Sequence, residues 1–158
     1  MFPTRILLAT DGTWEAALAE ETAVELSDGT GSELHVVHVV HLTPELPYPN
    51  TALRERSEAL LEWKKLDGIR LLDDRVRRLE ELGCSVTASY YREGWPQKEV
   101  IRLAEEIDAG LVITGGHRRP WFERIFCGPG FSETVLRRAG RPVLVVSERR
   151  LQGSTVPR

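Results

Sequence analysis

The chain alternates short apolar runs with longer helix-forming segments, and this alternation restricts its fold more than any other feature. Five runs have the apolar or β-branched composition of buried strands, and they cover residues 6–9, 33–42, 84–92, 110–116 and 142–146. Segments with helical patterns separate consecutive runs. Such alternation predicts a parallel sheet with helices on both faces. The expected fold class is therefore α/β, with a five-stranded parallel sheet.

Local signals set the ends of the expected helices. The first helix opens near Thr13, a candidate N-cap, and ends within residues 28–31, where two glycines occur. The second helix covers residues 51–82. Its expected inward stripe consists of Leu66, Ile69, Leu72, Val76 and Leu79. The third helix starts near Pro96, and the fourth runs from Ser132 to Ala139.

Length and composition restrict the class of protein. The 158 residues suffice for one domain, assigned to residues 1–148, and residues 149–158 are expected to form a flexible tail. The net charge of −3 gives no electrostatic basis for binding nucleic acid. Two isolated cysteines, Cys84 and Cys127, predict neither a disulfide framework nor a zinc site. No apolar run approaches the length of a membrane span, so we expect a cytoplasmic protein.

An acid follows the first apolar run, in the sequence RILLATDGT at residues 5–13. In an open parallel sheet, ligands bind at the carboxyl ends of strands where the winding direction reverses. We expect this reversal to bring Asp11 opposite the segment that begins at Gly115. Two roles for Asp11 remain open: its carboxylate accepts hydrogen bonds from a ligand, or it caps the following helix.

A long loop connects the fourth run to the last helix, within TGGHRRPWFERIFCGPGFSETV at residues 114–135. The glycines of this loop are Gly115, Gly116, Gly128 and Gly130. Glycine lets backbone N–H groups approach a phosphate closely, and the start of a helix at Ser132 favours anions. Arg118 and its neighbours add charged donors. The loop predicts either a phosphate site or a surface connection with solvated arginines.

The remaining polar clusters are expected to be structural. His35, His38 and His41 share one predicted strand, where they alternate faces and lie too far apart to hold one metal ion. The acid pairs at residues 20–21, 80–81 and 105–106 are expected on helix surfaces. No spacing typical of a Ser-His-Asp or Cys-His arrangement is legible. The sequence therefore predicts no catalytic residue.

Four segments, taken in order, resemble the universal stress protein family over roughly residues 3–147. They are RILLATDGT, LHVVHVV, EGWPQKEVIRLAEEIDAGLVITG and SETVLRRAGRPVLVV. The resemblance implies an adenine nucleotide alpha hydrolase-like fold, with strands in the order 3-2-1-4-5. It also implies a stress-response role and a homodimer paired through the last strand, at Val143, Leu144, Val145 and Val146. An apolar edge strand suits such pairing.

ATP-binding members of that family carry a signature after the fourth strand: Gly, two residues, Gly, nine residues, Gly, and then Ser or Thr. Gly115 and Gly128 match the first and third glycines of this signature. Arg118 replaces the second glycine, and Pro129 replaces the Ser or Thr. Proline removes both an N–H group and a hydroxyl from the expected phosphate site. The resemblance therefore implies a degenerate nucleotide site.

The same resemblance assigns roles around the nucleoside. Asp11 matches the acid beside it, Val39 matches a position whose backbone faces the base, and His117 lies where a polar residue approaches the nucleotide. Gly130 and Ser132 remain as donors near the phosphate. We therefore expect a regulatory or binding module that takes ATP or AMP, with magnesium only where ATP binds. The alternatives are an ATP-binding switch or slow ATPase, and a protein-interaction module that binds no nucleotide.

Overall fold

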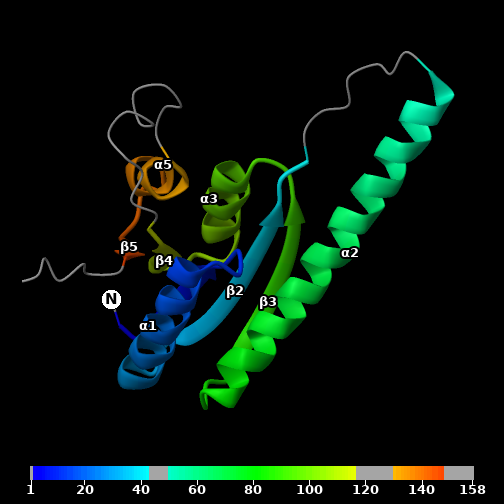
Figure 1. Cartoon of the computed structure of the whole chain (residues 1–158). Coiled ribbons are helices and arrows are strands. Elements are labelled where there is room, and N and C mark those ends of the chain that lie inside the picture. Colours follow the sequence, from blue (N-terminus) through cyan, green and yellow to red (C-terminus); the bar gives the residue numbers. More distant parts are fainter. Residues whose placement is uncertain (1, 43–49, 117–129, 148–158) are drawn as a thin grey trace, which may run out of the picture.

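A computed structural model describes residues 2–42, 50–116 and 130–147, which form one parallel sheet between two layers of helices (Figure 1). The strands lie in the order β3-β2-β1-β4-β5, and every neighbouring pair is parallel. The elements in chain order are β1 (Arg5–Ala9), α1 (Trp14–Thr30), β2 (Glu33–Val40), α2 (Thr51–Glu81), β3 (Val86–Glu93), α3 (Pro96–Glu106), β4 (Leu111–Gly115), α5 (Phe131–Arg138) and β5 (Val143–Val146). The expected fold class and strand order are confirmed.

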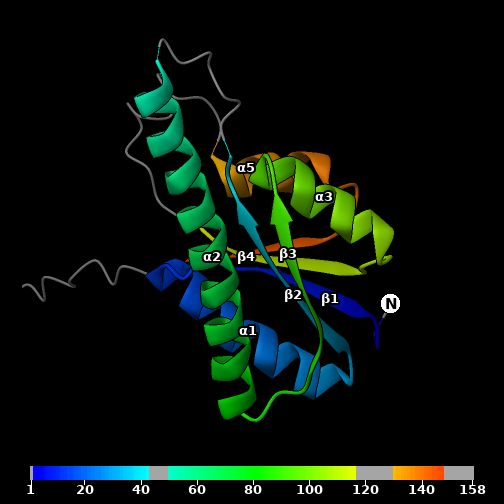
Figure 2. The ribbon, with the colours of Figure 1, turned by 90° about the vertical axis from the view of Figure 1, so that its right-hand side faces the viewer.

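Each face of the sheet has its own apolar core. Ile6 and Leu8 of β1 pack with α1 and α2 on one face, whereas Leu7 and Ala9 pack with α3 and α5 on the other. Figure 2 shows the two helix layers on either side of the strands. Because successive strand residues point to opposite faces, a strand covered on both sides is apolar throughout. This explains why residues 6–9 contain no polar position.

Small residues let α1 lie close to the sheet. Ala16, Ala19 and Ala23 are buried, and Thr13 caps the helix by accepting a hydrogen bond from the Ala16 N–H group at 3.2 Å. The helix continues through residues 28–30, and only Gly31 ends it, with a φ of +67°. The predicted cap is confirmed. The predicted end is confirmed at Gly31 and wrong at residues 28–29, which are still helical.

The predicted inward stripe of α2 is wrong at two positions. Leu66 and Ile69 are 55% and 41% exposed, whereas Leu72 and Leu79 are buried as predicted. Gly68 is the residue that faces the sheet at this level, because a Cβ atom there would collide with Val40 and lie 3.1 Å from Tyr91. The helix crosses β2 and β3 at this glycine, so the residues beside it point elsewhere.

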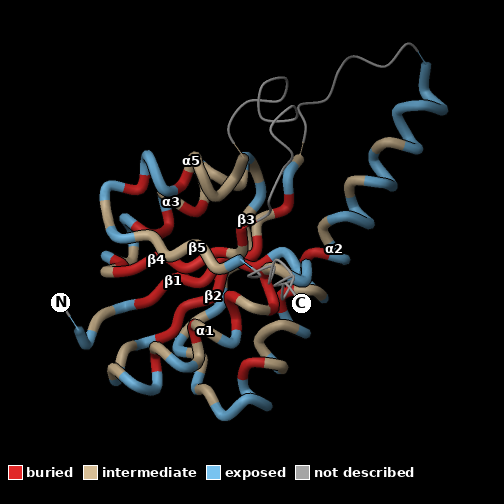
Figure 3. The backbone as a smooth tube through the Cα atoms, turned by 60° about the vertical axis from the view of Figure 1, so that its left-hand side comes forward, coloured by how far each residue is buried: buried red, intermediate tan, exposed pale blue. Residues whose placement is uncertain are grey.

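The burial pattern along α2 changes at the same level. Its buried residues, Gly68, Leu72 and Leu79, all lie in the C-terminal half, and the N-terminal half is mostly exposed (Figure 3). No helix in the described part of the chain is long and apolar enough to span a membrane. The expected C-terminal tail at residues 149–158 lies outside the described residues.

Candidate functional site

A cavity of about 880 Å³ opens at the carboxyl ends of β1, β2 and β4. The first turns of α1, α3 and α5 complete its walls. The predicted site residues that line it are Asp11, Val39, Gly115, Gly130 and Ser132. The other three, His117, Arg118 and Gly128, lie outside the described residues, as does Pro129. Asp11 and the described ends of the glycine-rich segment therefore border the same cavity.

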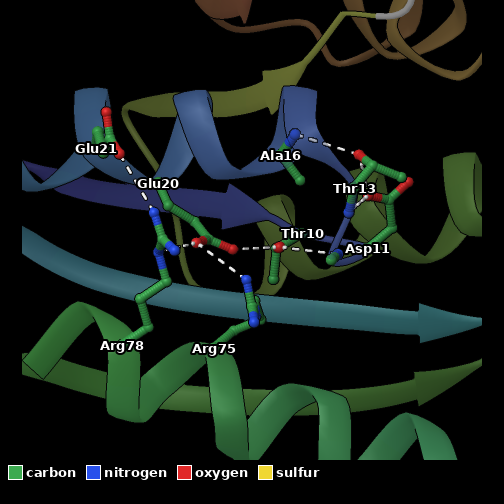
Figure 4. Close-up of polar contacts among 9 residues, drawn as sticks. Thr10, Asp11, Thr13, Ala16, Glu20, Glu21, Arg75 and Arg78 are labelled. Atoms are coloured by element: carbon green, nitrogen blue, oxygen red, sulfur yellow. Dashed lines mark hydrogen bonds and ion pairs between the residues drawn. The ribbon is translucent and has the colours of Figure 1, made fainter.

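Asp11 is held in place by the residue that caps α1. Its Oδ1 atom accepts hydrogen bonds from the Thr13 N–H group at 3.0 Å and from the Thr13 hydroxyl at 2.6 Å (Figure 4). The cap itself is Thr13, so Asp11 supports the capping residue and does not cap the helix directly. None of these hydrogen bonds uses the second carboxylate oxygen. Asp11 is exposed and borders the cavity, where that oxygen is suited to accept a hydrogen bond from a ligand.

A buried carboxylate supports the end of β1 from beneath the cavity. The Thr10 hydroxyl donates a hydrogen bond to Glu20 Oε1 at 2.7 Å, and Glu20 is fully buried. Arg75 and Arg78 of α2 reach Glu20 Oε2 at 3.8 Å and 3.4 Å (Figure 4). Burial raises the pKa of Glu20, and the Thr10 hydrogen bond and both arginines oppose that rise.

The expectation that residues 20–21 form a surface acid pair is therefore wrong for Glu20 and right for Glu21, which is exposed. Glu20 lies four residues after Ala16 and three before Ala23, on the buried face of α1. That spacing was the available sequence signal. An acid on a small-residue stripe needs a partner, since a buried charge is costly without one.

A histidine fixes the backbone of the same segment. His38 Nδ1 lies 2.8 Å from the Thr10 carbonyl oxygen, which only accepts, so this nitrogen carries a hydrogen and donates it. Thr10 also donates its N–H group to the Val37 carbonyl at 3.0 Å. His35 instead pairs with Tyr90 on the opposite face of the sheet, at 3.1 Å. Within the described ranges, no group of three or more His, Cys, Asp or Glu side chains is placed to hold a metal ion.

The end of β4 presses against the start of α1. A Cβ atom on Gly115 would lie 2.6–2.7 Å from backbone atoms of Glu15 and Ala16, so only glycine fits there. The Gly115 carbonyl accepts a hydrogen bond from the Ser132 hydroxyl at 2.7 Å. The hydroxyl hydrogen of Ser132 is thus used within the protein. Its oxygen and its N–H group are what Ser132 offers to a ligand.

The N-terminus of α5 faces the cavity without a side-chain cap. Gly130 is the N-cap residue, and no side chain accepts a hydrogen bond from the first turn. Gly130, Phe131, Ser132 and Glu133 all line the cavity. The first N–H groups of a helix have no partner within the helix, and they favour a bound anion. The Glu133 carboxylate in this turn pairs with Arg137 at 3.1 Å, which offsets its negative charge.

Part of the cavity wall is apolar. It is built by Val37, Val39, Pro96, Val100 and Phe131. Ligand sites are mostly apolar with a few placed polar groups, and volumes of about 300–1,000 Å³ are typical of them. The cavity therefore suits a molecule with an apolar part, hydrogen-bond donors for Asp11 and an anionic group for α5.

Comparison with known proteins agrees with this architecture. A sequence model of the universal stress protein family matches residues 3–147. The chain belongs to the universal stress protein family. It is 28% identical over 144 residues to a universal stress protein of Methanocaldococcus jannaschii, covering 91% of this chain and 82% of that protein.

Solved structures of the family share the fold. A family protein from Burkholderia pseudomallei is 27% identical, with a TM-score of 0.67 and coverage of 91% of this chain and 96% of that one. A universal stress protein family member from Arabidopsis thaliana, solved with AMP bound, is 17% identical, with a TM-score of 0.63 and coverage of 94% of each chain. At that identity the likeness to the Arabidopsis protein is one of fold.

Proposed function

We propose that this universal stress protein is a regulatory binding module whose cavity takes an adenine nucleotide with one phosphate, AMP first among the candidates. The observation that carries the proposal is the cavity itself, which is bordered by a carboxylate, an uncapped helix end and a set of apolar side chains. The AMP-bound Arabidopsis relative supports an adenine nucleotide as the ligand of this fold.

Each residue has a proposed role. The free oxygen of Asp11 accepts hydrogen bonds from ribose hydroxyls, and Val39 packs beside the base. Gly115, Gly130 and Ser132 surround the phosphate. The phosphate oxygens accept hydrogen bonds from the N–H groups of the first turn of α5. His117, Arg118 and Gly128, outside the described residues, are proposed to complete the phosphate end on the strength of the family resemblance alone.

One phosphate is favoured over three because the triphosphate signature is incomplete. Arg118 and Pro129 replace a glycine and a hydroxyl residue of that signature. The Ser132 hydroxyl, the nearby substitute, already donates its hydrogen to Gly115. The competing functions are an ATP-binding switch or slow ATPase that needs magnesium, and a protein-interaction module that binds no nucleotide.

Calorimetric titration of the full chain with AMP, cyclic AMP and ATP plus magnesium tests the proposal. We expect AMP to bind and Asp11→Asn to weaken binding about tenfold or more, which corresponds to about 1.4 kcal/mol. Asparagine keeps the Oδ1 acceptor for Thr13, and replaces only the outer oxygen by a donor. Asp28→Asn, at the far end of α1, is the matched control.

The titrations also separate the competing functions. Tighter binding of ATP with magnesium than of AMP would favour the switch, and no heat with any nucleotide would favour the interaction module. Unchanged AMP affinity in Asp11→Asn would reduce Asp11 to a support for the α1 cap.

We also infer a homodimer and a cytoplasmic location. The support for the dimer is β5, a four-residue edge strand whose residues, Val143, Leu144, Val145 and Val146, are all half-buried apolar side chains. Exposed apolar edges pair readily with another chain. Light scattering that gives a strict monomer at micromolar concentration would reject this dimer. The support for the location is the pair of isolated cysteines, which suits a reducing compartment.

A further inference from the structure

The N-terminal half of α2 extends beyond the sheet. The helix has 31 residues and is about 46 Å long, whereas β2 and β3 have eight residues each and span about 26 Å. Figures 1 and 2 show its first turns rising past the ends of both strands. The buried residues of α2 begin only at Gly68. We call residues 51–67 the projecting segment.

The projecting segment carries an apolar stripe that its own sheet does not cover. Leu53, Leu60 and Trp63 are 44%, 52% and 59% exposed. With Arg56 and Asp67 they recur at alternating intervals of three and four residues. At 100° per residue, these five positions fall within an arc of about 80°. We call this stripe the outer seam. Apolar positions at that spacing are typical of a helix that packs along another helix.

The charges on the outer seam favour a second copy of the same helix. Arg56 and Asp67 lie at equal distances from the midpoint between Leu60 and Trp63. In an antiparallel pair with its twofold axis at that midpoint, Leu60 faces Trp63 of the other copy, and Arg56 faces Asp67 at both ends. In a parallel pair, Arg56 would face Arg56 and Asp67 would face Asp67. Opposite charges stabilise the first arrangement, and like charges disfavour the second.

Four other charges of the projecting segment are engaged within the protein. Arg54 pairs with Glu58 at 2.9 Å, and Lys65 pairs with Glu62 at 3.7 Å. Arg56 and Asp67 of the seam, like Glu55 and Lys64 outside it, have no ion-pair partner among the described residues. Ala52 and Ala59 both lie along one edge of the seam, where their small side chains permit close approach of a second helix.

We propose that the outer seam is a self-association surface, on which two copies of this chain pair their projecting segments antiparallel. The contact is short, so the association is weak and depends on protein concentration. It involves neither the nucleotide cavity nor β5. Where β5 also pairs, the helix contact joins dimers into larger assemblies.

Sedimentation of the full chain over a range of concentrations tests this proposal with a charge swap. Arg56→Asp places two acids face to face, and Asp67→Arg places two bases face to face. We expect each variant to weaken the helix-mediated step about tenfold or more, because like charges repel at both ends of the contact. The double variant, or an equimolar mixture of the two single variants, restores opposite charges and should restore association.

The matched control is Arg77→Asp, which makes the same charge change on the docked half of α2. Circular dichroism confirms that each variant is folded. A β5 dimer would persist in every variant, which separates the two contacts. The proposal is overturned by any of three results: no seam-dependent step in the wild-type protein, single variants that associate normally, or a charge swap that fails to restore association. The last result would indicate a different partner on the seam.

Discussion

Glu20→Ala should destabilise the protein more than any other exchange of an acidic residue on α1. The carboxylate is fully buried and holds three groups: the Thr10 hydroxyl at 2.7 Å, Arg78 at 3.4 Å and Arg75 at 3.8 Å. Its removal leaves the hydroxyl without its acceptor, takes from Arg75 its ion-pair partner among the described residues, and leaves Arg78 with the exposed Glu21 alone. Because Thr10 lines the cavity, the loss also loosens the segment that carries Asp11.

The magnitude follows from the burial of the partners. Removal of one member of a buried ion pair costs about 3–5 kcal/mol. The Arg75 and Arg78 side chains are 25% and 40% exposed, so water solvates part of the released charge. We therefore expect Glu20→Ala to lower the free energy of unfolding by about 3 kcal/mol, the low end of this range. For a domain of this size, that loss lowers the unfolding temperature by about 6–12 °C. Glu20→Gln keeps the volume and the acceptor for Thr10, and should cost less than about 1.5 kcal/mol at neutral pH.

The pH dependence provides a second test. Burial raises the pKa of Glu20, so the folded protein holds this proton more tightly than the unfolded chain does. Its contribution to stability is therefore complete below the ordinary glutamate pKa and is lost as the pH rises through the raised value. The stability of the wild type relative to Glu20→Gln should fall over that window.

Urea unfolding followed by circular dichroism, at a series of pH values, measures both effects. Glu21→Gln is the control, since Glu21 is the exposed neighbour that pairs with Arg78 at 3.3 Å. A loss below about 1 kcal/mol in Glu20→Ala would show that the network contributes no more than a surface ion pair. A stability difference between wild type and Glu20→Gln that rises with pH would refute the argument from burial.

Two glycine substitutions extend these predictions to backbone packing. Gly115→Ala forces a methyl group against the backbone of α1. We expect it to destabilise the protein by about 2 kcal/mol and to displace the start of α1, as measured by thermal unfolding. Gly130→Ala is the control, because no atom lies within 4 Å of the added methyl group. Gly68→Ala gains about 1 kcal/mol of helix propensity, but its methyl group collides with Val40, so denaturant unfolding should show a net loss of stability. Gly29→Ala in α1 is the control: its methyl group meets no atom within 4 Å, and it should be neutral or stabilising. A stable Gly68→Ala protein would contradict the close crossing of α2.

The fold was predictable because its central strands are buried on both faces. Residues 6–9 are all apolar, and residues 33–40 contain four valines and a leucine. The helices between the strands have clear ends, so the type and order of the elements could be predicted from the sequence. The strand order itself rested on the family resemblance. The N-cap at Thr13 was predictable because it depends only on this residue and its near neighbours in the sequence.

The phase of α2 was not predictable in the same way. The residues on the sheet side of α2, including its projecting segment, are Leu61, Lys65, Gly68, Leu72, Val76 and Leu79, which are spaced as one helix face and are buried or half-buried. Lysine and glycine do not read as inward residues, so an apolar pattern selects Leu66 and Ile69 instead. Lys65 fits on this side of the helix because its long side chain carries the ammonium group to the Glu93 carboxylate, 3.9 Å away.

The buried network was hidden for a different reason. Glu20 pairs with Arg75 and Arg78, which lie more than fifty residues further along the chain, and no local pattern predicts such a contact. The sequence pattern places an acid on the buried face of α1 but does not indicate which residues pair with it. Long-range pairing of this kind needs the packing of α1 against α2, which only the assembled fold provides.

The starts of α1 and α5, two of the three helices that begin at the cavity, differ in what they offer to an anion. The start of α1 is capped by Thr13, whose hydroxyl is held by the Asp11 carboxylate, so an anion there would meet a negative charge and an occupied N–H group. The start of α5 has no side-chain cap, and Gly130 leaves its first N–H groups accessible from the cavity. Repulsion by Asp11 at α1 and the open N–H groups at α5 therefore both favour an anion at α5 over one at α1. In the proposed complex the anionic group of the ligand lies at α5 and its hydroxyl groups lie at Asp11, and the Asp11→Asn titration tests this orientation.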